Sequence, residues 1–178
     1  RTGDILMKLL MEQWKKYLTE IGDLSIDPYQ FQLHKAFPAD DQYFYNFTTD
    51  SGLQYYVGFD NDKLLGKGAL PWNIVFDVGD EASTDMTHEN EPLKIMSTIV
   101  AIIKEFIDTP EYHGGNLKFV FEGSRKGAEF LMPVDRPTSR TRLYTRFLKK
   151  NMPPGTKVEE MGNVVKFEVP SEDGNEAP

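Results

Sequence analysis

The chain has 178 residues, a net charge of −8 and 12% aromatic residues, which fits one globular domain able to form its own core. It contains no cysteine, so disulfides, a thiolate nucleophile and sulfur-ligated zinc sites are excluded. The acidic balance disfavours non-specific attraction to nucleic acid or anionic membranes, and no apolar run is long enough for a membrane span. We therefore expect a soluble protein.

The N-terminal segment has a helical pattern. Over residues 7–20, Leu10, Trp14 and Leu18 recur at helical spacing with charged residues between them, and Gly22 follows as a helix stop. This spacing predicts an amphipathic helix.

The next stretch has the alternation of strands. Residues 26–37 read as partly extended and interrupted by prolines. Residues 42–48 and 54–59 each alternate apolar with polar positions and flank the turn residues 50–52, so they predict a hairpin. Residues 72–78 alternate in the same way and predict a further strand.

A long apolar helix follows an acidic loop at residues 79–91. Pro92 fits the first helical position, with Asn90 as a cap, and the helix extends to Phe106. It is apolar nearly all round, which predicts burial. Residues 117–121 then predict another strand.

A second helix is predicted at residues 139–151, where a Thr-Ser pair can cap its start and a Pro-Pro-Gly run ends it. Residues 156–161 and 164–169 flank a Gly-Asn turn and predict a closing hairpin.

These elements predict an α+β fold with a mixed, mostly antiparallel sheet, two packing helices and an N-terminal helix. We divide the chain into a helical appendage or leader at residues 1–23, a single domain at 24–170 and a polar tail at 171–178.

The order of the predicted elements resembles the acetyltransferases of the GNAT type. Residues 142–147 (RLYTRF) also resemble the Leu-Tyr-x-(Lys/Arg)-(Leu/Phe) run that many of these enzymes carry late in the fold. The resemblance covers residues 40–169 and implies a GNAT-like fold. It also implies that Tyr144 is the candidate catalytic residue, as a general acid near the acyl-transfer centre.

The same resemblance identifies where the family binds coenzyme A, in a Gln/Arg-x-x-Gly-x-Gly/Ala turn that begins the long helix. Here residues 87–92 (THENEP) contain no glycine, and Pro92 lacks an N–H group. Glu89 and Glu91 would repel a diphosphate. We therefore expect no binding of coenzyme A in the family's manner, and we predict neither a cofactor nor a metal ion.

Residues 7–20 also resemble the leader of internal head proteins of T-even-type phages and their marine relatives. The matching positions are Met7-Lys8, Glu12, Trp14 and Leu18-Thr19-Glu20. In that family the leader directs the protein into the prohead, and the prohead protease cuts after the Glu. The resemblance implies processing at Glu20, phage head components as partners, and a location in the host-cell cytoplasm or the virion interior.

Basic residues are concentrated in residues 125–150, where eight Lys/Arg and two acidic residues give a charge of +6, so the rest of the chain carries −14. The second helix carries Arg142, Arg146, Lys149 and Lys150 at i, i+4, i+7 and i+8, which is one stripe. The stripe is either a solvated face or a recognition surface.

The start of this helix could hold an anion through Ser139, Arg140 and free backbone N–H groups. We therefore name Ser139, Arg140, Arg142 and Arg146 as candidate binding residues.

We expect from these observations a non-enzymatic phage structural or accessory protein that its leader delivers to the head, with a specific role that the sequence does not identify. Two alternatives stay open. One is a divergent acyltransferase-like enzyme that uses Tyr144, and the other is a phosphate or nucleic-acid binder that uses the basic helix.

Overall fold

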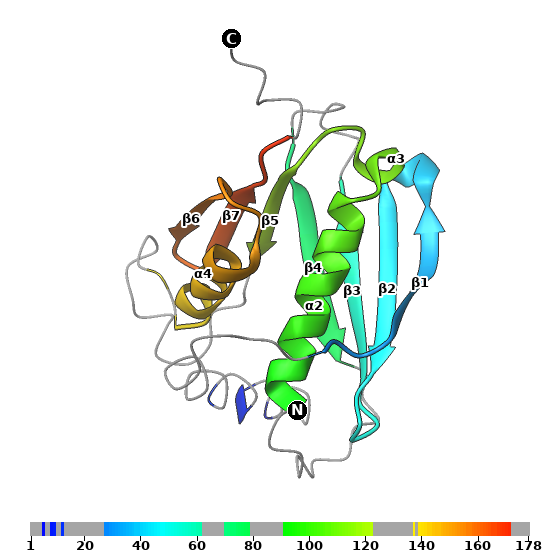
Figure 1. The fold of residues 1–178 in the computed structure, drawn as a ribbon, viewed down its shortest axis with the longest axis vertical. Coiled ribbons are helices and arrows are strands. Elements are labelled where there is room, and N and C mark those ends of the chain that lie inside the picture. The colour runs from blue at the N-terminus through cyan, green and yellow to red at the C-terminus, as the bar shows by residue number, and fades with distance from the viewer. Residues whose placement is uncertain are drawn as a thin grey trace.

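In a computed structural model of the chain, a seven-stranded sheet is covered on one face by helices (Figure 1). The structure describes residues 27–61, 70–78, 91–122, 137 and 139–171, together with residues 5, 8, 9 and 12, which are helical. The rest of the predicted leader and most of the acidic loop lie outside the described residues, as does the candidate processing site Glu20.

The first four strands form an antiparallel meander. They are β1 (Phe31–Phe37), β2 (Gln42–Thr48), β3 (Gln54–Asp60) and β4 (Trp72–Val78). The predicted hairpin and the strand at 72–78 are confirmed. β1 pairs with β2 along its length, with a bulge near its middle. The end of the segment that was predicted as partly extended is therefore an edge strand of the sheet.

The long predicted helix is α2 (Glu91–Ile107), and it leads into a short helix, α3 (Pro110–His113), that the sequence pattern does not predict. His113 holds this connection together, because its Nε2 lies 2.8 Å from the carbonyl oxygen of Ile107 and its Nδ1 accepts from the Gly115 N–H at 3.1 Å. These two bonds assign the Nε2–H tautomer to the ring.

The second half of the sheet contains β5 (Lys118–Glu122), β7 (Val164–Glu168) and the edge strand β6 (Lys157–Met161). The predicted closing hairpin and the second helix, α4 (Ser139–Asn151), are confirmed. The sheet order is β1-β2-β3-β4-β5-β7-β6, in which only β4 and β5 are parallel, so the fold is α+β with a mixed, mostly antiparallel sheet.

The parallel pair is short. β4 and β5 are in register only from Trp72↔Phe119 to Ile74↔Phe121. Among the described residues, β4 beyond that point pairs with β3 alone, through Val75 to Val78, and β5 continues with β7. The two halves of the sheet therefore separate at the carboxyl ends of this parallel pair.

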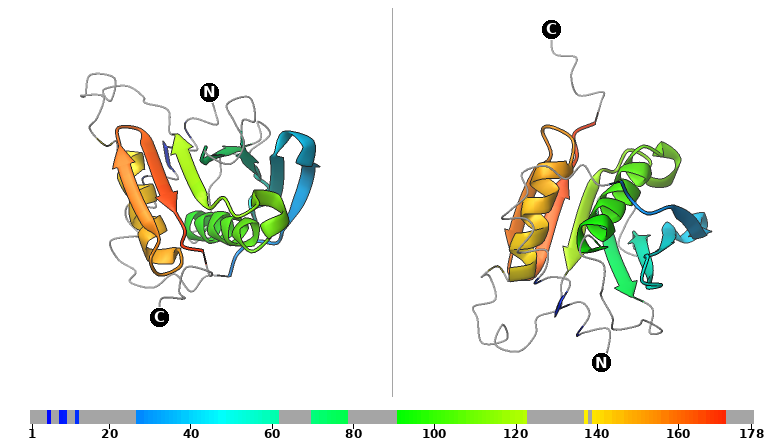
Figure 2. Two further views of the ribbon diagram at one scale, coloured as in Figure 1. Left: turned by 90° about the horizontal axis from the view of Figure 1, so that it is seen from above. Right: turned by 60° about the horizontal axis from the view of Figure 1, so that its bottom comes forward.

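α2 and α4 lie on the same face of the curved sheet, with α2 over the meander and α4 over β6 and β7 (Figures 1 and 2). The core between helices and sheet is rich in aromatic rings. Phe106 is at its centre, with ring centroids 4.0 Å from Phe59 and 5.0 Å from Trp72. Alternation along the strands supplies the other buried rings, which include Tyr45, Tyr55 and Phe119.

The opposite face of the sheet lacks a side chain at the middle of β3. A Cβ atom on Gly58 would lie 2.9 Å from the Phe44 ring and 3.0 Å from Val75 Cγ2. Gly58 therefore leaves room for the Phe44 ring over the middle of β3.

The start of β1 is tied to α2 by a buried hydroxyl. Thr98 Oγ1 accepts from the Tyr29 N–H at 2.8 Å and donates to the Lys94 carbonyl oxygen at 2.6 Å. The Lys94 ammonium lies 4.4 Å from the centroid of the Tyr29 ring and 4.0 Å from the Asp50 carboxylate. Tyr29 and Lys94 thus connect the chain before β1, the N-terminal end of α2 and the β2–β3 turn.

Candidate functional site

The predicted basic stripe lies on α4, and local contacts fix both ends of this helix. At the start, the Thr141 hydroxyl donates to the Gly162 carbonyl oxygen at 2.8 Å, which holds the helix on the β6–β7 turn. At the end, the Met152 N–H donates to Leu148 O at 2.9 Å, and Pro153 cannot continue the helix.

α4 has a buried side and a charged side. Thr141, Thr145, Phe147, Leu148 and Met152 are buried against the sheet and α2. Arg142, Arg146, Lys149 and Lys150 are all exposed, and we call this side of the helix the basic face. Within the described part of the chain, Arg142, Arg146 and Lys149 have no carboxylate at ion-pair distance. The backbone of Ser139 and Arg140 forms the first turn, while their side chains lie outside the described part.

Tyr144 lies on the side of α4 that faces the core. Its ring stacks on Phe121 of β5 with centroids 5.7 Å apart and planes 16° from parallel. Together with six aliphatic and aromatic side chains from α2 and α4, these rings line a cavity of about 10 Å³. A single water needs about 10–15 Å³ on this measure. The seam between the helices is therefore tightly packed, with room for about one water molecule.

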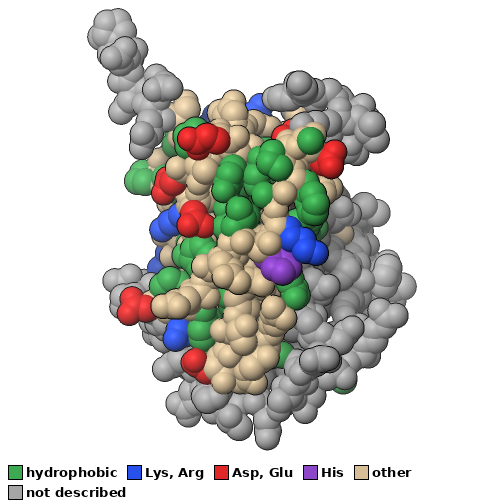
Figure 3. Space-filling model, turned by 90° about the vertical axis from the view of Figure 1, so that its right-hand side faces the viewer, with side chains coloured by type: hydrophobic (Ala, Val, Ile, Leu, Met, Phe, Trp, Pro, Cys, Tyr) green, Lys and Arg blue, Asp and Glu red, His purple; other side chains and the backbone are tan. Residues whose placement is uncertain are grey.

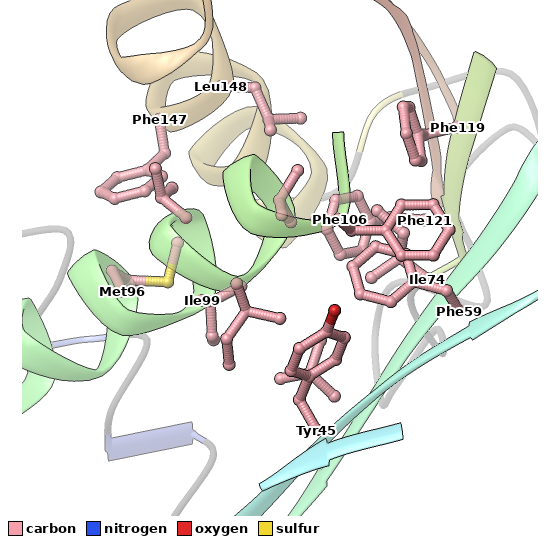
Figure 4. Packing of buried hydrophobic residues seen from close by; sticks show 14 of the residues in the cluster. Tyr45, Phe59, Ile74, Met96, Ile99, Phe106, Phe119, Phe121, Phe147 and Leu148 are labelled. Carbon is pink, nitrogen blue, oxygen red and sulfur yellow. The ribbon is translucent and has the colours of Figure 1, made fainter. Parts of the chain in front are cut away.

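Figure 4 shows how this seam is filled. Phe147 and Leu148 reach down from α4, and Met96 and Ile99 face them from α2. Because these four side chains are apolar, they offer no hydrogen-bonding group to a ligand in the seam.

A second charged surface is built from residues far apart in the sequence, and the sequence pattern did not predict it. We call it the acidic end. It consists of Asp40, Asp41, Asp60, Glu105, Asp108 and Glu111.

Two contacts bring the segments of the acidic end together. The Asn61 N–H donates to Asp41 O at 3.1 Å, which joins the end of β3 to the start of β2. The rings of Tyr43 and Tyr112 stack with centroids 4.3 Å apart, which places α3 beside β2. Figure 3 views the molecule from the side of β1, and several Asp and Glu side chains lie on the upper half of this face.

The charges of the acidic end affect buried tyrosines. Burial raises the pKa of Tyr43, and the Asp41 carboxylate raises it further. Burial also raises the pKa of Tyr45, with the Glu105 carboxylate as the next cause. Both phenols are therefore held in the neutral form well into the alkaline range.

Two further classes of site can be assessed in the described ranges. No group of three or more His, Asp or Glu side chains there is arranged to hold a metal ion. No helix among these residues is long and apolar enough to cross a membrane.

Comparisons with protein-family models, with curated proteins and with solved structures found no match for this chain. The argument for function therefore rests on the residues and their arrangement.

Proposed function

We propose that this protein is a non-enzymatic structural or accessory protein of a phage head, and that the basic face of α4 is a contact surface for its partners. The leader resemblance over residues 7–20 supports the location. The exposure of Arg142, Arg146, Lys149 and Lys150 on one side of α4 supports the contact surface.

The order of the elements supports a GNAT-like fold as part of this proposal. An antiparallel meander ends in β4, a buried helix leads to a parallel β5, and a second helix precedes the final hairpin. This order resembles that of the acetyltransferase family, and the separation of β4 from β5 gives the sheet two diverging halves.

The observation that carries the non-enzymatic assignment is the tight packing of the Tyr144 ring in the seam between α4 and β5. A general acid has to reach the reacting group of a substrate within hydrogen-bonding distance. The Tyr144 ring instead packs on Phe121 and lines a cavity no larger than one water. Its packing is that of a residue that joins α4 to β5.

The enzymatic alternative is tested by acetyl-coenzyme A binding. We predict no heat of binding at millimolar acetyl-coenzyme A, because the turn at residues 87–92 is acidic and lacks glycine. A micromolar dissociation constant, together with acyl transfer that Tyr144→Phe abolishes, would establish the acyltransferase and contradict the proposal.

The head assignment is tested in infected cells. The tagged full chain is expressed during phage assembly, and head particles are purified on a density gradient. We expect the protein to sediment with the heads and to carry a new N-terminus at Ile21. Glu20→Gln should prevent the cut without changing the melting temperature. A protein that stays at the top of the gradient would contradict the head assignment.

The contact surface is tested separately with an Arg140→Ser, Arg142→Ser and Arg146→Ser variant. We expect it to lose head association while its melting temperature stays within about 2 °C, since exposed charges contribute little to stability. If the variant still sediments with the heads as the parent does, the basic face is only solvated surface and not a contact surface.

A further inference from the structure

We propose that the basic face of α4 binds the acidic end of a second copy of this chain, so that the protein associates head to tail. The two surfaces have opposite charge and lie at different places on the same molecule. This inference rests on the contact surface in the proposed function, and it adds the identity of a partner.

Each surface contains charges that lie unfavourably in their own helix, namely Arg142 on the basic face and Glu105 and Asp108 at the acidic end. Arg142 lies in the first turn of α4, where the positive end of the helix dipole disfavours a cation and no acidic residue offsets it. Glu105 and Asp108 lie at the C-terminal end of α2, where the dipole disfavours an anion. Contact between the two surfaces would place opposite charges beside these residues and so offset their unfavourable interactions with the helix dipoles.

The second argument is geometric. In every view, α4 and α3 lie on opposite sides of α2, so the basic face cannot reach the acidic end of its own chain (Figures 1 and 2). The contact has to form between two molecules. A contact that uses different surfaces on its two partners leaves one of each surface free, and it can therefore repeat.

Nucleic acid is an alternative partner for the basic face. Nucleic acid would also satisfy the basic face, but the rest of the chain carries a charge of −14 and repels a polyanion. A second copy presents its negative charge as a local surface of opposite sign to the basic face. Among the described residues, Lys104 is the one cation in the last turn of α2, so the acidic end keeps a net negative charge.

The experiment is sedimentation velocity of the full chain at increasing protein concentration. At about 0.01 M salt the Debye length is about 30 Å, and at 1 M it falls to about 3 Å. We expect the sedimentation coefficient to rise with concentration in low salt and to return to that of a monomer in high salt.

Two charge-reversal variants test the surfaces separately. The basic-face variant carries Arg142→Glu and Arg146→Glu, and the acidic-end variant carries Asp108→Lys and Glu111→Lys. Each variant alone should associate at least about ten-fold more weakly than the parent, because like charges then face each other across the contact. An equimolar mixture should form dimers again, since each variant keeps the surface that its partner lacks.

A matched control has the same change of net charge at exposed positions outside the basic face and the acidic end. Lys118→Glu with Lys157→Glu reverses two lysines on β5 and β6. This control should associate about as strongly as the parent, because both surfaces are unchanged. All variants are first checked by melting temperature, and Arg142→Gln with Arg146→Gln replaces the basic-face variant if that protein does not fold.

Three results would overturn the inference. They are a parent that stays monomeric at about 0.01 M salt, association that persists in both variants, and a mixture of the two variants that stays monomeric. A monomeric parent that retards duplex DNA through the basic face would assign nucleic acid as the partner instead. Absence of the protein from purified heads would contradict the head assignment alone, because sedimentation of the isolated chain does not depend on it.

Discussion

The hydroxyl of Thr98 should contribute measurably to the stability of the domain, and Thr98→Val tests this with almost no change of shape. Thr98 is fully buried, and its Oγ1 accepts from the Tyr29 N–H at 2.8 Å. Valine fills the same space but leaves this N–H without an acceptor. A buried unsatisfied donor costs about 1–3 kcal/mol. Helix propensity adds little, because threonine and valine are similar in α-helices.

For a chain of this size, about 1 kcal/mol lowers the melting temperature by about 2–4 °C, so Thr98→Val should melt about 2–12 °C below the parent. Thr98→Ser is the matched control, because it keeps the hydroxyl and loses one methyl group. Hydrogen exchange separates the two effects. The Tyr29 amide should lose its protection in Thr98→Val and keep it in Thr98→Ser. A valine variant that melts with the parent and protects this amide would refute the assigned hydrogen bond.

Three further predictions concern packing, ionisation and the anchoring of α4. Gly58→Ala should lower the unfolding free energy by about 1–3 kcal/mol, because the new Cβ would lie 2.9 Å from the Phe44 ring; Phe44→Leu in the same chain should recover part of the loss, and a thermal melt reads out both. The pKa of Tyr45 is raised above the ordinary 10.0 in the native state, so the native state keeps the phenol proton that the unfolded chain loses. This contribution to stability is complete below pH 10.0 and is lost as the pH rises above that value. Tyr45→Phe should therefore flatten the fall in melting temperature above about pH 10, and an unchanged slope would contradict the role of Tyr45. Thr141→Val should destabilise the chain by about 1–3 kcal/mol, because the Gly162 carbonyl oxygen loses its buried donor at 2.8 Å; a denaturant titration measures this, with Thr141→Ser as the control.

The elements with a strong local pattern were predictable. The strand at 72–78, the hairpin of β2 and β3, and the helix at 139–151 all have the predicted residues, within one position at the ends. Alternation at two residues, or recurrence at three to four, reflects which side of an element is buried. The exposure of Arg142 and Arg146 follows from the same periodicity.

The elements that depend on distant partners were harder to predict. β1 is almost entirely exposed and shows no alternation, and its strand structure comes from pairing with β2. α3 has four residues, too few for a helical pattern, and is held by the stack of Tyr112 on Tyr43 and by the hydrogen bonds of His113.

For the candidate site, the sequence by itself determined which residues are charged, that they form a stripe on α4, and that the turn before α2 lacks glycine. The tertiary structure alone decided that β7 lies between β5 and β6 and that the Tyr144 ring packs in the seam between α4 and β5. It also decided that carboxylates from positions 40 to 111 form one acidic end. The reason is physical: periodicity records the neighbours of a residue along its own element, whereas strand pairing and helix packing join segments whose separation in sequence leaves no local pattern.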